Sequence, residues 1–274
     1  MQNSDSTINV NLAIKQRLTI RIGRGTLSFA MPQEQGKDIV YEPFVVKSGV
    51  SMAANLREAF RQADLLLQAP SRVRVSIDSD VLLVPIETFN ENDIETLHNH
   101  AFPRQEQDAM YYNVLPDLNA VAVFSMNRDL RLVVDDHFQD VRLITAISPV
   151  WRHLHQRSFT GSRQKLYGYF HENRLEVFGF QQNRFRFSNS FDAVRTKDSI
   201  YYLLYIWNQL QLDAKHDELH LVGEIPEQEQ LLDELKHYVE KVYVINPAAD
   251  FNNHPVTQIK GMPYDLQTLF VKGR

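Results

Sequence analysis

The chain of 274 residues contains no cysteine. This absence excludes disulfide bonds, thiolate catalysis and cysteine metal sites, and it fits a reducing compartment. Long apolar runs are also missing, since no stretch approaches the roughly 20 residues that a membrane helix needs. Residues 1–10, MQNSDSTINV, lack the basic and apolar regions of a signal peptide. We therefore expect a soluble, cytoplasmic protein that does not enter a membrane.

The chain has fewer basic than acidic residues, with 29 Lys and Arg residues and 34 Asp and Glu residues, which gives a net charge of −5. Phosphate binding along a nucleic acid favours a basic face. We therefore expect no nucleic-acid partner. The densest short basic stretch contains Arg17, Arg21 and Arg24, a spacing typical of an exposed strand face.

Patterns that bind metal ions are absent as well. The pairs His98/His100 and His153/His155 are each two residues apart, which places the two side chains on different faces of a helix. Residues 135–137, Asp-Asp-His, match no established ligand spacing. The sequence therefore predicts no metal site, and it identifies no catalytic residue.

One order of elements occurs twice in this chain. Apolar residues that alternate along the chain, or recur at helical spacing, predict β-β-β-α-β-α-β in each half. In the first half the elements are residues 18–22, 27–30, 39–46, 52–67, 73–77, 128–137 and 141–147, with further apolar runs at 81–86, 110–115 and 120–126. In the second half they are residues 166–170, 175–178, 185–191, 198–210, 218–223, 226–239 and 241–245.

We therefore expect an α/β protein with mixed sheets, divided into two lobes at residues 1–150 and 151–274 with a cleft between them. The most linker-like segment is residues 158–164, SFTGSRQ. After Asn246 the three prolines at 247, 255 and 263 predict a loop-rich tail.

Two glycine-containing segments are candidates for ligand binding. Gly23-Arg24-Gly25-Thr26 follows the first strand, where backbone N–H groups and a hydroxyl can cradle a phosphate. A plain hairpin turn with positive φ angles would use the same residues. Residues 219–224 are predicted to form the end of a strand, a glycine and the start of a helix. This arrangement can bind a nucleotide near the helix N-terminus, or it can be a tight turn between strand and helix. The candidates are Gly23, Arg24, Gly25, Thr26, Gly223 and Glu224.

This arrangement resembles the actin/heat-shock-chaperone/sugar-kinase ATPase superfamily, whose two lobes are ribonuclease H-like. Within it, the chain is most similar to a family of uncharacterised bacterial proteins with an actin-like ATPase fold. The resemblance covers roughly residues 18–245 and rests on element order. It implies ATP as a candidate ligand of the interlobe cleft. In active members of the superfamily, each phosphate hairpin carries an Asp followed closely by Gly, and these acids organise Mg²⁺ and the attacking water.

This chain departs from that pattern. The first hairpin, residues 20–26, keeps both glycines and the threonine without a preceding Asp, and the second, residues 167–173, has no Asp-x-Gly. Glu224 stands where the adenosine motif has its second glycine. Phosphoryl transfer depends on Mg²⁺ and on a residue that orients the nucleophile. We therefore expect a degenerate member, a pseudo-ATPase without efficient hydrolysis.

Three functions remain open from the sequence, of which the third is a purely structural partner of a multiprotein assembly, with no ligand in the cleft. The first is a binding or scaffold protein that holds a small molecule in the interlobe cleft or a protein partner on its surface. The second is an active Mg²⁺-dependent ATPase or small-molecule kinase with relocated acids, for which Asp78, Asp80, Glu172 and Asp192 are candidates. The sequence names neither the cofactor, the ligand nor the partner.

Overall fold

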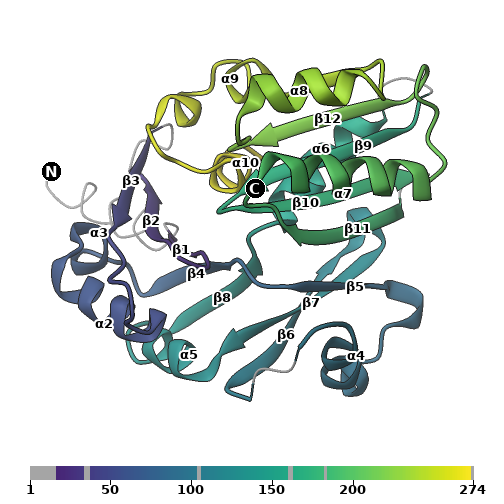
Figure 1. Cartoon of the computed structure of the whole chain (residues 1–274). Helices are drawn as coiled ribbons and strands as arrows, with labels where there is room; N and C mark the ends of the chain where they lie inside the picture. Colours follow the sequence, from purple (N-terminus) through teal and green to yellow (C-terminus); the bar gives the residue numbers. More distant parts are fainter. Residues whose placement is uncertain (1–16, 34–37, 104–105, 160–162, 182–183, 273–274) are drawn as a thin grey trace, which may run out of the picture.

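The computed structural model describes residues 17–33, 38–103, 106–159, 163–181 and 184–272. Over these residues the chain forms two α/β lobes, each built on a five-stranded mixed sheet, and a smaller three-stranded sheet (Figure 1). This architecture confirms the fold class that the element order predicts.

The first lobe contains the sheet with strand order β3-β2-β1-β4-β8. Its strand β1 pairs with β2 as an antiparallel hairpin and with β4 in parallel, so that Ile20 lies beside both Phe29 and Val75. The strands are β1 (Leu18–Ile22), β2 (Leu27–Pro32), β3 (Ile39–Phe44), β4 (Arg72–Ile77) and β8 (Asp140–Thr145). The helices of this lobe that cover the sheet's outer face are α2 (Met52–Gln62), α3 (Asp64–Leu67) and α5 (Arg128–Asp135).

The second lobe repeats the same topology, with strand order β11-β10-β9-β12-β13. Its strands are β9 (Lys165–His171), β10 (Arg174–Gln181), β11 (Arg184–Asp192), β12 (Glu218–Gly223) and β13 (Val242–Val244). Its outer helices are α7 (Thr196–Gln209) and α8 (Gln228–Lys236). Among the described residues, no helix is both long and apolar enough to cross a membrane.

An insertion distinguishes the first lobe from the second. Between β4 and α5, the chain forms a separate antiparallel sheet with strand order β5-β7-β6. The elements of the insertion are β5 (Val81–Pro85), η1 (Ile86–Thr88), η2 (Glu91–Asp93), α4 (Ile94–Ala101), β6 (Asp108–Leu115), η3 (Pro116–Leu118) and β7 (Ala120–Asn127). The apolar runs predicted at 81–86, 110–115 and 120–126 are its three strands.

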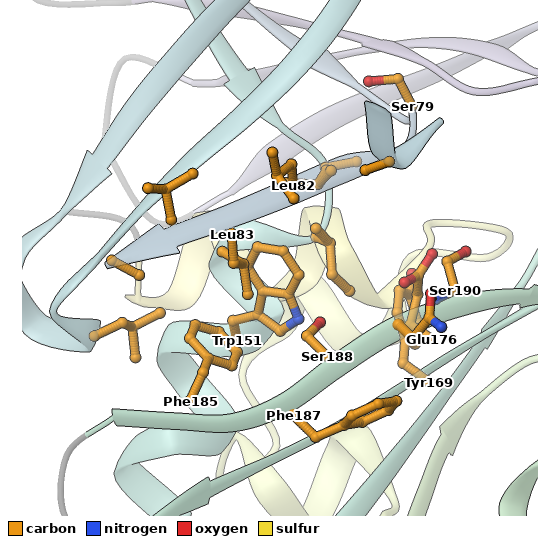
Figure 2. A pocket seen from close by; sticks show the side chains of 18 of the residues that line it. Ser79, Leu82, Leu83, Trp151, Tyr169, Glu176, Phe185, Phe187, Ser188 and Ser190 are labelled. Atoms are coloured by element: carbon orange, nitrogen blue, oxygen red, sulfur yellow. The ribbon is translucent and has the colours of Figure 1, made fainter. Parts of the chain in front are cut away.

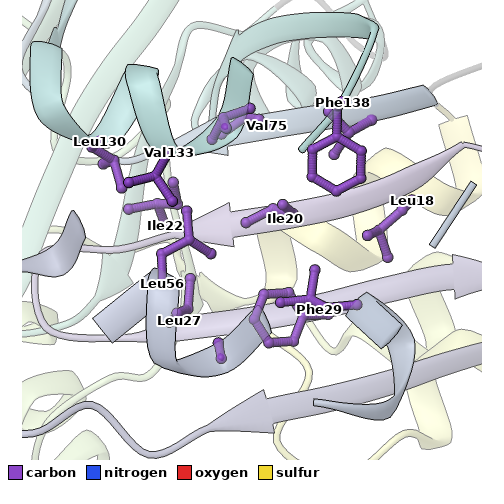
Figure 3. Close-up of a cluster of buried hydrophobic side chains, with 14 of the residues drawn as sticks. Leu18, Ile20, Ile22, Leu27, Phe29, Leu56, Val75, Leu130, Val133 and Phe138 are labelled. Carbon is purple, nitrogen blue, oxygen red and sulfur yellow. The ribbon is translucent and has the colours of Figure 1, made fainter. Parts of the chain in front are cut away.

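The core of the first lobe follows from the alternation along its strands. Ile20, Ile22 and Val75 point to the outer face, where they contact Leu56 of α2 and Val133 of α5 (Figure 3). Ser51 caps the N-terminus of α2, because its side chain accepts a hydrogen bond from the N–H of Ala54. The side chains on the opposite face of each strand therefore point into the interior of the molecule.

Two helices lie between the two large sheets. The first, α6 (Ser148–Ser158), packs Trp151 and Leu154 against the inner face of the second sheet. The second, α10 (Tyr264–Lys272), packs Leu266 and Leu269 against the inner face of the first sheet. The loop-rich tail predicted after Asn246 is therefore wrong. This segment contains α9 (Pro247–Asp250), η4 (Pro255–Gln258) and α10.

Candidate functional site

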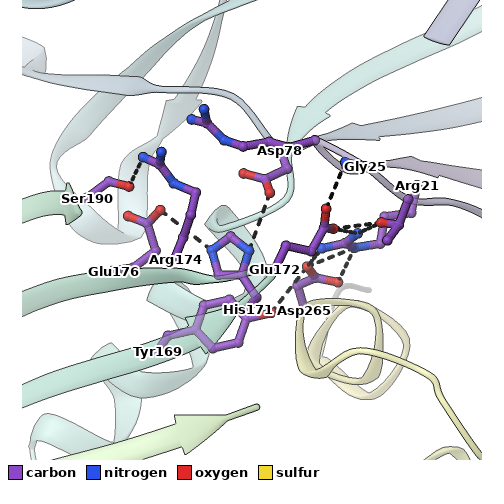
Figure 4. A network of polar contacts seen from close by, with 12 residues as sticks. Arg21, Gly25, Asp78, Tyr169, His171, Glu172, Arg174, Glu176, Ser190 and Asp265 are labelled. Carbon is purple, nitrogen blue, oxygen red and sulfur yellow. Dashed lines mark hydrogen bonds and ion pairs between the residues drawn. The ribbon is translucent and has the colours of Figure 1, made fainter. Parts of the chain in front are cut away.

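Two hairpin turns, one from each lobe, meet in the polar network of Figure 4. The first contains Gly23 to Thr26 and joins β1 to β2. The second joins β9 to β10 through Glu172 and Asn173, whose φ angles are +44° and +60°. Positive φ at both central residues is typical of a two-residue hairpin. This turn places the Glu172 side chain opposite the first hairpin.

The Glu172 carboxylate lies within the first hairpin. It accepts hydrogen bonds from the Thr26 hydroxyl at 2.6 Å, from Arg21 Nη1 at 2.7 Å and from the Gly25 N–H at 3.1 Å. A Cβ atom at Gly23 would lie 2.0 Å from Glu172 Oε1, so a larger residue there would displace this carboxylate. Although burial opposes ionisation, Arg21 and the other donors hold the pKa of Glu172 below its usual value. The protein's own carboxylate therefore uses the donors that the sequence assigns to a phosphate.

Arg21 connects three parts of the chain. Its side chain is 3% exposed, and its Nη2 lies 2.8 Å from Oδ2 of Asp265, which is 1% exposed and belongs to α10. Tyr169 of β9 donates a further hydrogen bond to the same carboxylate at 3.3 Å. Burial alone would lower the pKa of Arg21, but the contact with Asp265 outweighs it and raises that pKa. A buried cation thus joins the first sheet, the C-terminal helix and the second hairpin.

His171 forms a second contact between the lobes. Its Nδ1 lies 3.3 Å from Asp78 Oδ2, at the end of β4, and its Nε2 lies 3.6 Å from Glu176 Oε1 on β10. Burial disfavours the charged ring, yet the two carboxylates raise the pKa of His171 to about 10. For Asp78, burial is also outweighed, and His171 lowers its pKa. The ring is therefore an imidazolium at neutral pH.

Asp80 completes the charged contacts of the cleft. Its Oδ1 lies 2.7 Å from Arg24 Nη2 and 3.0 Å from Arg174 Nη2, and Arg174 also contacts Asp192 at 3.0 Å. Each of the four acids considered as a relocated catalytic group therefore faces an Arg or His side chain. Within the described parts of the chain, no group of three or more His, Asp or Glu residues is arranged to hold a metal ion.

The other predicted ligand residues lie at the end of β12. Gly223 has a φ of +96°, and a Cβ atom there would lie 2.1 Å from the carbonyl oxygen of Phe170. The N–H of Glu224 donates to that same oxygen at 2.9 Å. Gly223 is thus required for close approach to β9, next to the second hairpin. The structure places Gly23, Arg24, Gly25 and Thr26 together, with Gly223 and Glu224 beside β9, the strand that precedes Glu172.

A cavity of about 570 Å³ lies between β5 and β11 (Figure 2). None of the six predicted ligand residues is among the described residues that line it. In the described parts of the chain, Trp151 Nε1 and Ser79 Oγ are buried there without a hydrogen-bond partner. The apolar wall contains Leu82, Leu83, Trp151, Phe185 and Phe187, and the polar end contains Asp78, Ser79, His171, Glu176, Ser188 and Ser190.

The hairpins do not fit the Mg²⁺·ATP that the resemblance implies. A triphosphate needs the donors of Arg21, Gly25 and Thr26, and these already bind the Glu172 carboxylate. A second anion at that position would be repelled by Glu172. Mg²⁺ prefers carboxylate and water ligands, whereas the nearby carboxylates face protein cations. We therefore derive no chemical step through this nucleotide.

Comparison with known proteins supports the fold. The chain is similar to a protein of unknown function with an actin-like ATPase fold from Bacteroides thetaiotaomicron VPI-5482, with a TM-score of 0.83 and 26% identity over 95% of this chain and 97% of that chain. It is also similar to a chain of the PilM-PilN type IV pilus biogenesis complex, with a TM-score of 0.53 and 11% identity over 85% of this chain and 89% of that chain. No curated protein matches the sequence.

These likenesses confirm the resemblance to actin-like ATPases that the element order predicts. A family model described as "Protein of unknown function (DUF3822)" matches residues 5–242, which is most of the sequence. The chain therefore belongs to the DUF3822 family, and it has an actin-like ATPase fold.

Proposed function

We propose that this protein is a binding or scaffold protein that has kept the actin-like fold and lost efficient ATP hydrolysis. The observation that carries the proposal is the Glu172 carboxylate, which bonds to Arg21, Gly25 and Thr26 in the place of a phosphate. In this protein the two hairpins are joined by a side chain, so no nucleotide is needed to hold them together. Residues 1–150 and 151–274 would be the two lobes, with α6 crossing from one to the other.

The rival function is a Mg²⁺-dependent ATPase or kinase with relocated acids. It requires a carboxylate that is free to bind Mg²⁺ or to orient a nucleophile. Asp78 and Asp80 are the best placed in the cleft, but they face His171 and Arg24 at 3.3 and 2.7 Å.

Replacing Glu172 with alanine tests the proposal. We expect no Mg²⁺-dependent phosphate release from ATP by either the wild type or Glu172→Ala. In the variant, Arg21, Gly25 and Thr26 lose the Glu172 carboxylate, although Arg21 keeps Asp265, so ADP should bind the first hairpin at least about tenfold more tightly than in the wild type. The amide NMR signals of Gly23 and Gly25 report binding at this position.

The matched control is Glu176→Ala, which removes a carboxylate of the same strand pair that does not contact the first hairpin. It should leave the affinity for ADP unchanged. ATP turnover by the wild type that Asp78→Asn or Asp80→Asn abolishes would establish the rival instead.

The cavity between β5 and β11 is the proposed small-molecule site of the cleft. Its apolar wall suits an aromatic or aliphatic body, and Ser79 Oγ and Trp151 Nε1 are buried polar atoms to which a ligand can bond. Among the described residues that line the cavity, four carboxylates outnumber three cations: Asp78, Glu87, Glu176 and Asp265 against His171, Arg184 and Arg186. The ligand head should therefore be uncharged or cationic, because an anion would meet net negative charge.

Three probes with the same indole body test this site: tryptamine, tryptophol and indole-3-acetate. The chain has two tryptophans. Trp151 lines the cavity, whereas Trp207 belongs to α7 and lies in the core of the second lobe. We expect tryptamine and tryptophol to move the indole N–H signal of Trp151 and leave that of Trp207 in place, with indole-3-acetate at least about tenfold weaker.

Asp78→Asn and Asp80→Asn are the matched variants for this experiment, because both remove one carboxylate from the same turn. Only Asp78 lines the cavity. Asp78→Asn should reduce the preference for tryptamine over indole-3-acetate, and Asp80→Asn should not. Equal movement of both tryptophan signals, or tighter binding of the carboxylate probe, would contradict the assignment.

A scaffold role has a precedent in the fold. A chain of similar fold occurs in the PilM-PilN type IV pilus biogenesis complex, and its name describes an assembly with another protein. A lobe pair fixed by charged contacts offers a partner a constant surface, whereas a nucleotide-dependent pair would change its surface with each cycle. We therefore propose that this chain, too, has a protein partner.

A further inference from the structure

A second cavity, of about 290 Å³, lies between β4 and β8 of the first sheet and the two inner helices α6 and α10. Its lining contains three arginines, Arg74, Arg142 and Arg152. Among the described residues that line it, there is no Asp or Glu. In a chain with a net charge of −5, this concentration of positive charge calls for a specific explanation.

The pairing of β4 with β8 shows how the charge arises. Arg72 lies beside Asp140 in the register of the two strands, and their side chains form an ion pair at 2.7 Å. At the next position on the same face, Arg74 lies beside Arg142. Neighbouring strands are about 4.8 Å apart, so like charges at such a position destabilise the sheet. The charges at the Arg72–Asp140 position therefore cancel, whereas the Arg74–Arg142 position carries two positive charges.

The fold leaves these two cations without compensation. Within the described residues, no carboxylate lies at ion-pair distance from Arg74 or Arg142, whereas Arg152 contacts Asp117 at 2.6 Å. Burial, together with the charges of Arg142 and Arg17, lowers the pKa of Arg74 to about 10. A bound anion would relieve both the burial cost and the repulsion.

A helix end adds to the positive character of this cavity. The first residues of α6, Ser148 and Pro149, belong to its lining. This helix has 11 residues. The N-terminus of a helix carries a partial positive charge and favours anions. Two guanidinium groups and a helix N-terminus therefore surround one small space.

We propose that this cavity binds a small polyanion that carries two or more phosphate or carboxylate groups. Guanidinium groups recognise both kinds of anion through paired N–H donors. The volume of about 290 Å³ limits the ligand to a compact molecule. The site is independent of the proposed function, because it shares no lining residue with the cavity between β5 and β11 and contains none of the hairpin residues.

Calorimetric titration of the full chain tests this site, with pyrophosphate and citrate as probes and ionic strength kept constant with sodium chloride. We expect the wild type to bind at least one probe at millimolar concentration or below. Arg74→Gln and Arg142→Gln should each weaken binding about tenfold, because each removes a charged donor. Binding of pyrophosphate alone would identify a phosphate ligand, and binding of citrate alone a carboxylate ligand.

Arg72→Gln is the matched control. It removes the same charge from the same strand and face, two residues away, but at a position already neutralised by Asp140. Its affinity for the probe should stay close to that of the wild type. Absence of binding by the wild type, or equal weakening by Arg72→Gln and Arg74→Gln, would overturn the proposal. Arg142 lies on an exposed edge strand, so Arg142→Gln provides a folded variant if Arg74→Gln does not fold.

Discussion

Replacing Arg21 with glutamine is expected to destabilise the protein by about 3–5 kcal/mol, as measured by the free energy of unfolding in urea. Arg21 and Asp265 are 3% and 1% exposed, and their side chains bond at 2.8 Å. Glutamine removes the charge, so the Asp265 carboxylate would remain buried without a cation. The Glu172 carboxylate would lose a donor at 2.7 Å at the same time. Both losses act on the native state and add to one another.

Two further variants separate this explanation from a general effect of charge. Arg24→Gln removes a cation from the same hairpin, but the Arg24 side chain is 39% exposed, so about 0–1 kcal/mol should be lost. The pair Arg21→Met with Asp265→Leu removes the unpaired Asp265 carboxylate and should recover part of the stability, while Glu172 still lacks its Arg21 donor. If Arg21→Gln cost no more than Arg24→Gln, the buried network would not hold the lobes together as described here.

The stability of the protein is expected to fall as the pH rises from about 7 to 9.5, by about 2–4 kcal/mol. The cause is His171, whose pKa is raised to about 10 by Asp78 and Glu176 despite burial. A group with a raised pKa in the native state contributes fully below its pKa in the unfolded chain, about 6.5. This contribution is lost progressively as the pH rises toward the native value. Urea unfolding at several pH values measures the change.

The variant His171→Gln should be less stable at pH 7 and should flatten the pH dependence. His100→Gln is the control, because His100 lies exposed on α4 and contacts neither carboxylate. The window ends at pH 9.5 because burial raises the pKa of Tyr169 and of Tyr264, and these groups add their own pH dependence above about 10. An unchanged slope in His171→Gln would show that other groups cause the effect.

Much of the fold was accessible from the sequence because it depends on local patterns. The alternation of Leu18, Ile20 and Ile22 predicts a strand with one buried face, and the structure places that face against α2 and α5. The same reasoning predicted the β-β-β-α-β-α-β order of both lobes and the resemblance to actin-like ATPases. It also predicted the strands of the insertion, but not that they form a sheet of their own, since pairing joins residues far apart in the chain.

The end of the chain was predicted least well. Pro247, Pro255 and Pro263 indicated loops, and each proline stands at or next to the start of a helical element. Proline is tolerated in the first turn of a helix because the N–H that it lacks has no partner there. Asp265, which binds Arg21, lies in this segment, and its sequence neighbours carry no signal for that contact.

The sequence alone determined that the usual Asp residues are missing from both hairpins, and hence that efficient ATP hydrolysis is not expected. Only the tertiary structure decided which group bonds to the donors of the first hairpin. Glu172 is 146 residues from Thr26 along the chain, and its carboxylate reaches the Thr26 hydroxyl at 2.6 Å because the two sheets meet at their hairpins. The pair Arg74 and Arg142 likewise depends on strand register. A sequence motif consists of residues that are neighbours along the chain. Electrostatic interactions depend instead on distances in space, and folding sets those distances.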